Sequence, residues 1–288
     1  MTTCYFVSDL HGSISRYEIL FREIIRNKPS FVFLGGDLLP HIHRSVRFGN
    51  KEIPDFMNDY LIPGFKNVRR QLGCNYPEVF AIMGNDDHRI EEPAFLEGEK
   101  IELWKYLNMS KFKFGPYMIY GYPFVPPTPF MLKDWEKFDV SRYVDPGCSD
   151  PTEGFRTAEP DYDPEYSTIQ KDLSALSGND DMSKAIFLFH TPPYKSMLDR
   201  AGLDGRMVDH VPLDVHVGSI AVQRFIEEKQ PWITMHGHIH ESARITGEWK
   251  QLTGRTHSFS AAHDGQELSI VKFQIDNPVD CERIIIAE

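Results

Sequence analysis

The sequence contains few cysteines, and their spacing excludes two common kinds of scaffold. Its four cysteines lie far apart and form no CxxC pair: Cys4, Cys74, Cys148 and Cys281. Structural zinc sites and disulfide frameworks need paired or regularly spaced cysteines, so we expect neither. Residues 1–9 also lack the basic segment and the apolar core of a signal peptide. These absences favour a cytoplasmic protein with reduced thiols.

Long apolar runs and an excess of basic residues are missing as well. No run approaches the roughly 18 apolar residues of a membrane-spanning helix, so we expect no membrane association. The formal net charge of -11 argues against extended nucleic acid as a partner, because such binding needs a basic face that releases counterions. A small phosphorylated ligand remains compatible with this charge, since a metal centre supplies local positive charge.

The hydrophobic pattern predicts one layered α/β domain over residues 1–288. In the first half, residues 4–8, 31–34, 79–83 and 117–120 form apolar strand-like runs. Between the first two runs, Tyr17, Leu20 and Ile24 are spaced as one face of a helix. Residues 51–72 are predicted to be helical in part. This alternation of strand and helix indicates a largely parallel sheet with helices on its faces.

Residues 122–165 interrupt the alternation and are rich in proline, aspartate and aromatic residues. We expect an ordered insertion that crosses the surface, with its aromatic side chains either shaping a ligand pocket or packing in the core: Tyr122, Phe124, Phe130, Trp135 and Tyr143.

The alternation returns after the insertion, with predicted helices at 165–177 and 217–225 and strands at 185–189 and 232–235. Four late strand-like runs without helices, at 243–246, 256–260, 268–274 and 283–286, predict a second, antiparallel sheet.

Residues of the kinds that bind metals follow the ends of five predicted strands. They are Asp9 and His11, Asp37, Asn85, His190, and His238 with His240. Ligands of open α/β sheets bind outside the carboxyl ends of the strands, so we expect all of these side chains at one edge. Each segment alone is a weak signal, because Gly-Gly-Asp or Asn-Asp also forms ordinary turns. Five such segments in order are hard to attribute to chance.

The segments DLH (9–11), GGD (35–37), GND (84–86), HTPP (190–193) and GHIH (237–240) together resemble the calcineurin-like metallophosphoesterase family. The resemblance implies a four-layer αββα sandwich of two mixed sheets, with two divalent ions at the strand ends and a hydroxide between them as nucleophile. It assigns Asp9, His11 and His240 to one ion, Asn85, His190 and His238 to the other, and Asp37 to both. Such ligands suit manganese, iron, zinc, nickel or cobalt without selecting among them.

Asp86 departs from the family pattern, which usually has a histidine at this position to protonate the leaving group. A carboxyl group beside two cations has a lowered pKa and stays ionised, so it is a poor acid. Three explanations are open: the substrate has a good leaving group, another histidine (His88, His41 or His43) replaces the missing one, or the enzyme is slow or inactive. We name Asp37, Asp86 and His88 as candidate catalytic residues, with a structural surface position as the alternative for His88.

Two further residues of this region receive hypotheses. Asp87 matches a carboxylate that often follows in the family motif, and we hypothesise that it orients a metal-ligand histidine. His236 is expected to pack at the end of its strand.

The sequence therefore predicts a metal-dependent phosphoesterase acting on a phosphodiester or a small phosphorylated metabolite, a nucleotide-like one included. The alternative is a catalytically weak or inactive binding scaffold with the same fold. A scaffold that had lost catalysis should also have lost ligands, yet all seven ligand positions are filled, which favours an enzyme. A protein serine/threonine phosphatase is disfavoured, because Arg44 and Arg89 do not match the arginine spacing of that class.

Overall fold

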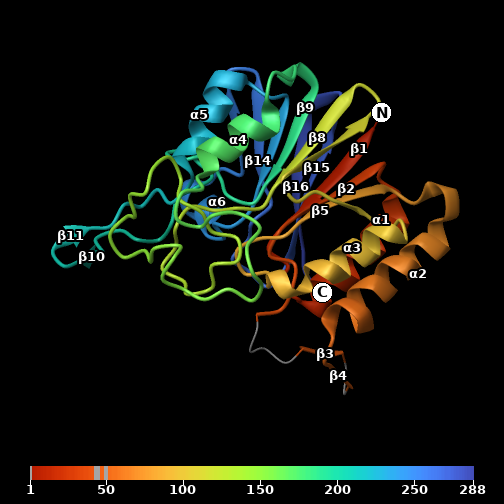
Figure 1. Ribbon diagram of the computed structural model, residues 1–288. Coiled ribbons are helices and arrows are strands. Elements are labelled where there is room, and N and C mark those ends of the chain that lie inside the picture. Colours follow the sequence, from red (N-terminus) through yellow and green to blue (C-terminus); the bar gives the residue numbers. More distant parts are fainter. Residues whose placement is uncertain (1, 42–45, 49–50) are drawn as a thin grey trace.

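Two six-stranded sheets pack face to face, with helices on their outer sides (Figure 1). This arrangement comes from a computed structural model that describes residues 2–41, 46–48 and 51–288. Both sheets are mixed, and the expected four-layer α/β sandwich is confirmed. Among the described residues, no helix is both long and apolar enough to cross a membrane. All four cysteines are free, as the sequence predicted.

The first sheet is built around parallel strands from the start of the chain. Its order is β16 (Asn277–Ile286), β15 (Leu268–Gln274), β1 (Thr3–Val7), β2 (Phe31–Gly35), β5 (Glu78–Ile82) and β6 (Lys105–Tyr106). Strands β1, β2, β5 and β6 run parallel, whereas β15 and β16 are antiparallel additions. The helices α1 (Ile14–Asn27), α2 (Ile62–Leu72) and α3 (Glu92–Lys100) lie against it (Figure 1).

The second sheet has a parallel centre with antiparallel edges. Its order is β13 (Lys250–Thr253), β14 (Thr256–Ser260), β12 (Ile233–His236), β9 (Ala185–Phe189), β8 (Tyr117–Tyr122) and β7 (Ser110–Phe114). Strands β14, β12, β9 and β8 are parallel. The helices α4 (Ile169–Ser177) and α5 (Ile220–Lys229) cover its outer face (Figure 1). Helix α4 starts later than predicted, because the Thr168 side chain caps it by accepting a hydrogen bond from the Lys171 N–H.

The late strands contradict the predicted separate antiparallel sheet. Strands β13 and β14 join the second sheet, whereas β15 and β16 join the first through an antiparallel pairing of β15 with β1. Hydrophobic alternation identifies a strand but not the strand it pairs with. Because each sheet has an edge strand that can accept a partner, the sequence did not determine which sheet the late strands join. Residues 243–246 are not a strand; they belong to the short helix α6 (Ser242–Thr246), which ends at Gly247 in a left-handed conformation.

Two short hairpins and a long connection complete the chain. The hairpins are β3 (Val46–Phe48) with β4 (Lys51–Ile53) and β10 (Met207–Val208) with β11 (Val211–Pro212). Of the segment from 51 to 72, residues Met57–Leu61 form a turn of π-helix that runs into α2. Residues 123–168 link β8 to α4 without a helix or a strand, and they run beside β10 and β11 (Figure 1).

Aromatic side chains fill the space between the two sheets. Strand side chains alternate, so Val32 and Leu34 of β2 face the helices, whereas Phe31 and Phe33 face the other sheet. Phe33 is fully buried, and its ring stacks on Phe80 with centroids 5.5 Å apart. Because both faces of β2 are buried, its sequence is a continuous apolar run.

Replacing Phe33 with alanine is expected to lower the free energy of unfolding by about 3–5 kcal/mol, because a large cavity would open between the sheets. Urea denaturation followed by circular dichroism measures the change. Phe155→Ala is the matched control, since that ring is 48% exposed, and it should cost less than about 1 kcal/mol. Equal losses in the two variants would contradict this view of the core.

Candidate metal centre

The predicted ligand residues follow parallel strands of both sheets at one edge of the sandwich. Asp9, Asp37 and Asn85 come after β1, β2 and β5, whereas His190 and His238 come after β9 and β12. Several of these residues adopt a left-handed backbone that is uncommon outside glycine, with φ of 57° at Asp9, 51° at Asp37 and 71° at His238. Such conformations cost free energy and cluster at functional sites.

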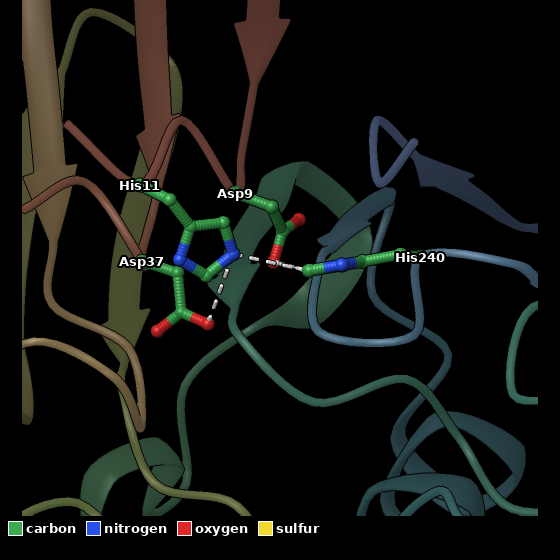
Figure 2. A group of neighbouring side chains, drawn as sticks. All are labelled: Asp9, His11, Asp37 and His240. Atoms are coloured by element: carbon green, nitrogen blue, oxygen red, sulfur yellow. Dashed lines mark hydrogen bonds and ion pairs between the residues drawn. The ribbon is translucent and has the colours of Figure 1, made fainter. Parts of the chain in front are cut away.

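The side chains form two groups that share one carboxylate. Asp9, His11, Asp37 and His240 offer ligand atoms within 4.8 Å of one another. Figure 2 shows these four side chains pointing toward one another. Asp37, His190 and His238 form a second group by the same measure. Asp37 therefore lies between the two groups, in the position of a bridging ligand.

Contacts within these groups bring ligand-type atoms together. The Nε2 atoms of His11 and His240 lie 3.2 Å apart. His190 Nε2 lies 3.3 Å from Asp37 Oδ2 and 3.1 Å from Asn85 Oδ1, so Asn85 joins the second group. The other ring nitrogen of His190 is 2.8 Å from the Gly35 carbonyl oxygen, which fixes the ring. All seven predicted ligand residues thus lie together.

Two buried carboxylates give this region a strongly negative potential. Burial alone would raise the pKa of Asp9, but the hydrogen bond and the charge of His240 outweigh burial and bring this pKa to about 2. Burial lowers the pKa of His190, but the nearby Asp37 carboxylate outweighs burial and raises this pKa to about 10. The same potential favours divalent cations, and the oxygen and nitrogen donors fit the borderline metals of the first transition series.

Asp86 lies beside His41. The Asp86 backbone N–H donates to Asp37 Oδ1 over 2.8 Å, and its Oδ2 atom lies 2.8 Å from His41 Nδ1. The His41 ring stacks on the His11 ring with centroids 5.0 Å apart. From the sequence, His41 is only one of three candidate histidines. Its pairing with Asp86 depends on the conformation of the loop after β2, which the local sequence does not predict.

Of the other two candidate histidines, the structure describes only His88. His88 is only 7% exposed, so the surface position considered for it is wrong. His43 lies outside the residues that the structure describes. His236 is buried, with its ring nitrogens 2.8 Å from the Thr191 carbonyl oxygen and 2.8 Å from Thr234 Oγ1, which agrees with its expected packing role.

Asp87 joins the loops that carry the ligands. Its fully buried carboxylate accepts backbone hydrogen bonds from Leu38, Leu39 and Gly84 over 3.1, 2.7 and 2.9 Å. Burial and the charge of Asp37 raise its pKa to about 8. These backbone partners occupy the carboxylate, so the hypothesis that Asp87 orients a ligand histidine is wrong. Asp87 instead ties the loop after β2 to the loop after β5.

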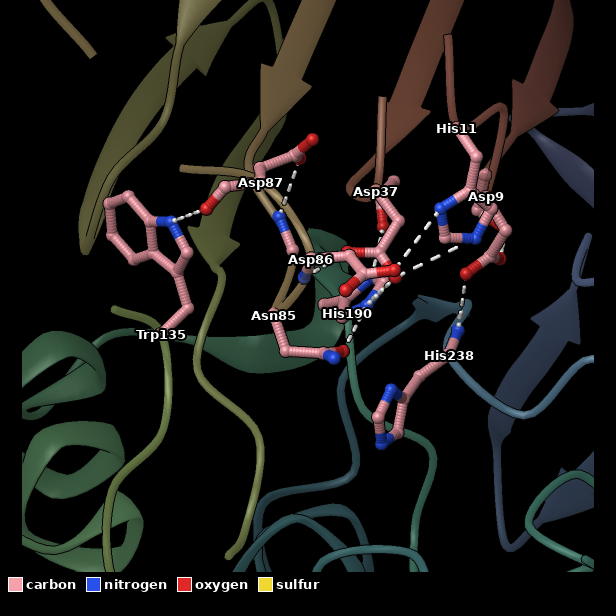
Figure 3. A network of polar contacts seen from close by, with 12 residues as sticks. Asp9, His11, Asp37, Asn85, Asp86, Asp87, Trp135, His190 and His238 are labelled. Carbon is pink, nitrogen blue, oxygen red and sulfur yellow. Dashed lines mark hydrogen bonds and ion pairs between the residues drawn. The ribbon is translucent and has the colours of Figure 1, made fainter. Parts of the chain in front are cut away.

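Trp135 anchors the insertion to the loop after β5. Its indole Nε1–H donates to the Asp87 carbonyl oxygen over 2.9 Å, and the side chain is fully buried (Figure 3). Tyr122 and Phe124 are buried in the core as well, whereas Phe130 and Tyr143 line a cavity. Packing in the core is therefore confirmed for three of these aromatic residues, whereas a role of Phe130 and Tyr143 in ligand binding stays a prediction.

The cavity has a volume of about 520 Å³ and opens beside the ligand groups. His11, Asp37, Asn85, His238 and His240 line its inner end. Its outer wall comes from the insertion and from the segment between β9 and α5. A substrate held at the ligand groups would extend into this space.

Comparison with known proteins identifies relatives of this fold. A family model described as calcineurin-like phosphoesterase matches residues 2–242. The crystal structure of TT1561 from Thermus thermophilus is 16% identical, with 99% of each chain covered and a TM-score of 0.57. Another crystal structure is 13% identical over 99% of each chain, with a TM-score of 0.60. At these identities the two structures establish the fold alone. By sequence, no curated protein matches the chain.

Trp135→Phe is expected to destabilise the protein by about 1–3 kcal/mol, because the buried Asp87 carbonyl oxygen loses its donor. Thermal and urea unfolding measure the loss. Trp249→Phe is the control, since that indole is only half-buried, and it should cost less than about 1 kcal/mol. A Trp135→Phe protein as stable as the wild type would show that this hydrogen bond does not anchor the insertion.

Proposed function

The chain belongs to the calcineurin-like phosphoesterase family, as its motifs predicted, and on this premise we propose that it hydrolyses phosphate esters with two bound metal ions. The observation that carries the proposal is the position of Asp37, which belongs to both groups of ligand-type side chains. One carboxylate shared by two such groups is the arrangement that a dinuclear centre needs. The family membership supports phosphoester hydrolysis, and the donor set supports the metals.

The ligand assignment follows the two groups. Asp9, His11 and His240 would hold one ion, whereas Asn85, His190 and His238 would hold the other. Asp37 would contact both. When bound, the ions supply a nucleophilic water and positive charge for the phosphate. Manganese, iron, zinc, nickel and cobalt all suit these donors.

The protein's own residues have two further roles in this proposal. Asp86 holds the His41 ring by its Nδ1 atom over 2.8 Å, and Nε2 of the same ring would protonate the leaving group of the ester. His41 is therefore the replacement for the missing motif histidine, and Asp86 is the residue that positions it. The scaffold alternative is disfavoured, because no ligand position of either group has been lost.

Purified wild-type protein is expected to hold about two divalent ions per chain and to hydrolyse bis(4-nitrophenyl) phosphate when manganese is added. Asp37→Ala should reduce the metal content below about one ion per chain and abolish turnover, because both groups lose a ligand. Elemental analysis and nitrophenolate release measure the two effects. His257→Ala, in β14, is the control and should retain both metal and activity. Wild-type protein without metal or turnover would overturn the proposal.

His41→Ala is expected to slow hydrolysis of esters with poor leaving groups by about 100-fold or more, which is the usual contribution of a general acid. Esters of 4-nitrophenol need little protonation and should be slowed much less. The measurement is kcat for a series of aryl phosphate esters of rising leaving-group pKa. If His88→Ala, and not His41→Ala, steepened the dependence on leaving-group pKa, the assignment of His41 would be wrong.

A further inference from the structure

The outer part of the cavity has its own chemical character. Its 520 Å³ falls within the range of about 300–1,000 Å³ that is typical of small-molecule sites. The ligand groups occupy only the inner end. The remaining space lies between the insertion and the segment that carries β10 and β11, so it would receive the organic part of a phosphate ester.

Apolar side chains form much of this outer wall. Val140, Leu203 and Leu213 are half-buried and line the cavity, and Phe130 lines it while 57% exposed. The insertion and the segment of β10 and β11 are in close contact here. A Cβ atom added at Gly147 would lie 3.3 Å from Leu213 and 3.3 Å from Val208. Apolar groups on a concave wall gain free energy when an apolar ligand displaces water from them.

The charged groups of the outer wall are acidic. Asp139, Asp145, Asp214 and Glu241 line the cavity, and none of its described lining residues is a lysine or an arginine. Most of these acids already have protein donors. Asp139 accepts hydrogen bonds from the Ser219 hydroxyl and the Ile220 N–H.

Two of the other three acids show the same pattern. Asp214 accepts from the Tyr194 hydroxyl over 2.6 Å. Glu241 accepts from the Gly202 N–H over 3.0 Å. These three carboxylates therefore do not require a cationic ligand, and all four acids of the wall repel a second anionic group.

We infer that this site takes phosphate esters whose organic part is apolar and carries no further negative charge. The inference rests on the proposed function, which places the phosphate at the inner end of the cavity. It excludes nucleoside polyphosphates and phosphorylated sugar acids as preferred substrates. Selection comes from two separate features of the wall: apolar contact favours the right substrates, and the carboxylates reject anionic ones.

Phosphonates that cannot be hydrolysed test the inference without any need for turnover. Methylphosphonate, hexylphosphonate and 6-phosphonohexanoate present the same head group with no tail, an apolar tail and a carboxylate-ended tail. Calorimetric titration of the manganese-loaded protein gives the three dissociation constants. Hexylphosphonate should bind at least about tenfold more tightly than methylphosphonate. The carboxylate-ended tail should lose at least about tenfold of the affinity of the hexyl tail.

Matched variants locate the effect in the wall. Leu213→Ser should weaken hexylphosphonate by about threefold or more and leave methylphosphonate unchanged. Leu252→Ser makes the same change on β13, at a side chain that is 62% exposed, and should alter neither. Asp145→Asn should strengthen binding of 6-phosphonohexanoate alone. Its control is Asp209→Asn, in the turn between β10 and β11 but not a lining residue, where asparagine tolerates the left-handed φ of 48°.

Each remaining outcome has a definite meaning. Equal binding of methylphosphonate and hexylphosphonate overturns the inference and leaves the proposed function intact. Two other results overturn the inference in the same way. One is tighter binding of 6-phosphonohexanoate than of hexylphosphonate; the other is a tighter binding of hexylphosphonate than of methylphosphonate that Leu213→Ser does not reduce. Binding of none of the three phosphonates overturns the proposed function, and the inference that rests on it falls as well.

Discussion

The contact on which the site depends is that of the Asp37 carboxylate with histidines from separate parts of the chain. Its Oδ2 atom lies 3.3 Å from His190 Nε2 and 3.9 Å from His11 Nε2. A buried carboxylate is costly unless positive charge compensates it. The surrounding donors meet that need in part, and the two ligand groups around Asp37 are the place where divalent ions would complete it. Asp37 is buried, has a left-handed backbone conformation, and contributes to the negative potential of the site.

The separation of the two sheets determines whether that contact forms. Asp37 follows a strand of the first sheet and His190 follows a strand of the second, so the aromatic layer around Phe33 lies between the strands that carry these two side chains. Asp87 and Trp135 then hold the loops in place, and through Trp135 they tie the insertion to the site. The insertion, which forms part of the cavity wall, is therefore connected to the same loops that carry the ligand residues.

The sequence predicts the ligand edge well because strand ends and metal-type residues are local features. Its Gly-Gly-Asp and Gly-Asn-Asp segments can be interpreted as ordinary turns, but the structure shows a second reason for the glycines in them. A side chain at Gly36 would meet the His190 ring, and one at Gly84 would meet the Asp37 carboxylate. Pairings across the fold were beyond such patterns: β15 with β1, His41 with Asp86, and Trp135 with Asp87. Each pairing is a tertiary contact between distant segments, and the local sequence of one segment does not predict which other segment it contacts.

Anomalous diffraction from crystals of the manganese-loaded protein tests the central claim most directly, because it locates the ions relative to Asp37. The account predicts two manganese peaks about 3.5–4 Å apart, both in contact with the Asp37 carboxylate, one beside His240 and the other beside His190. A single peak, or two peaks of which only one touches Asp37, would contradict it.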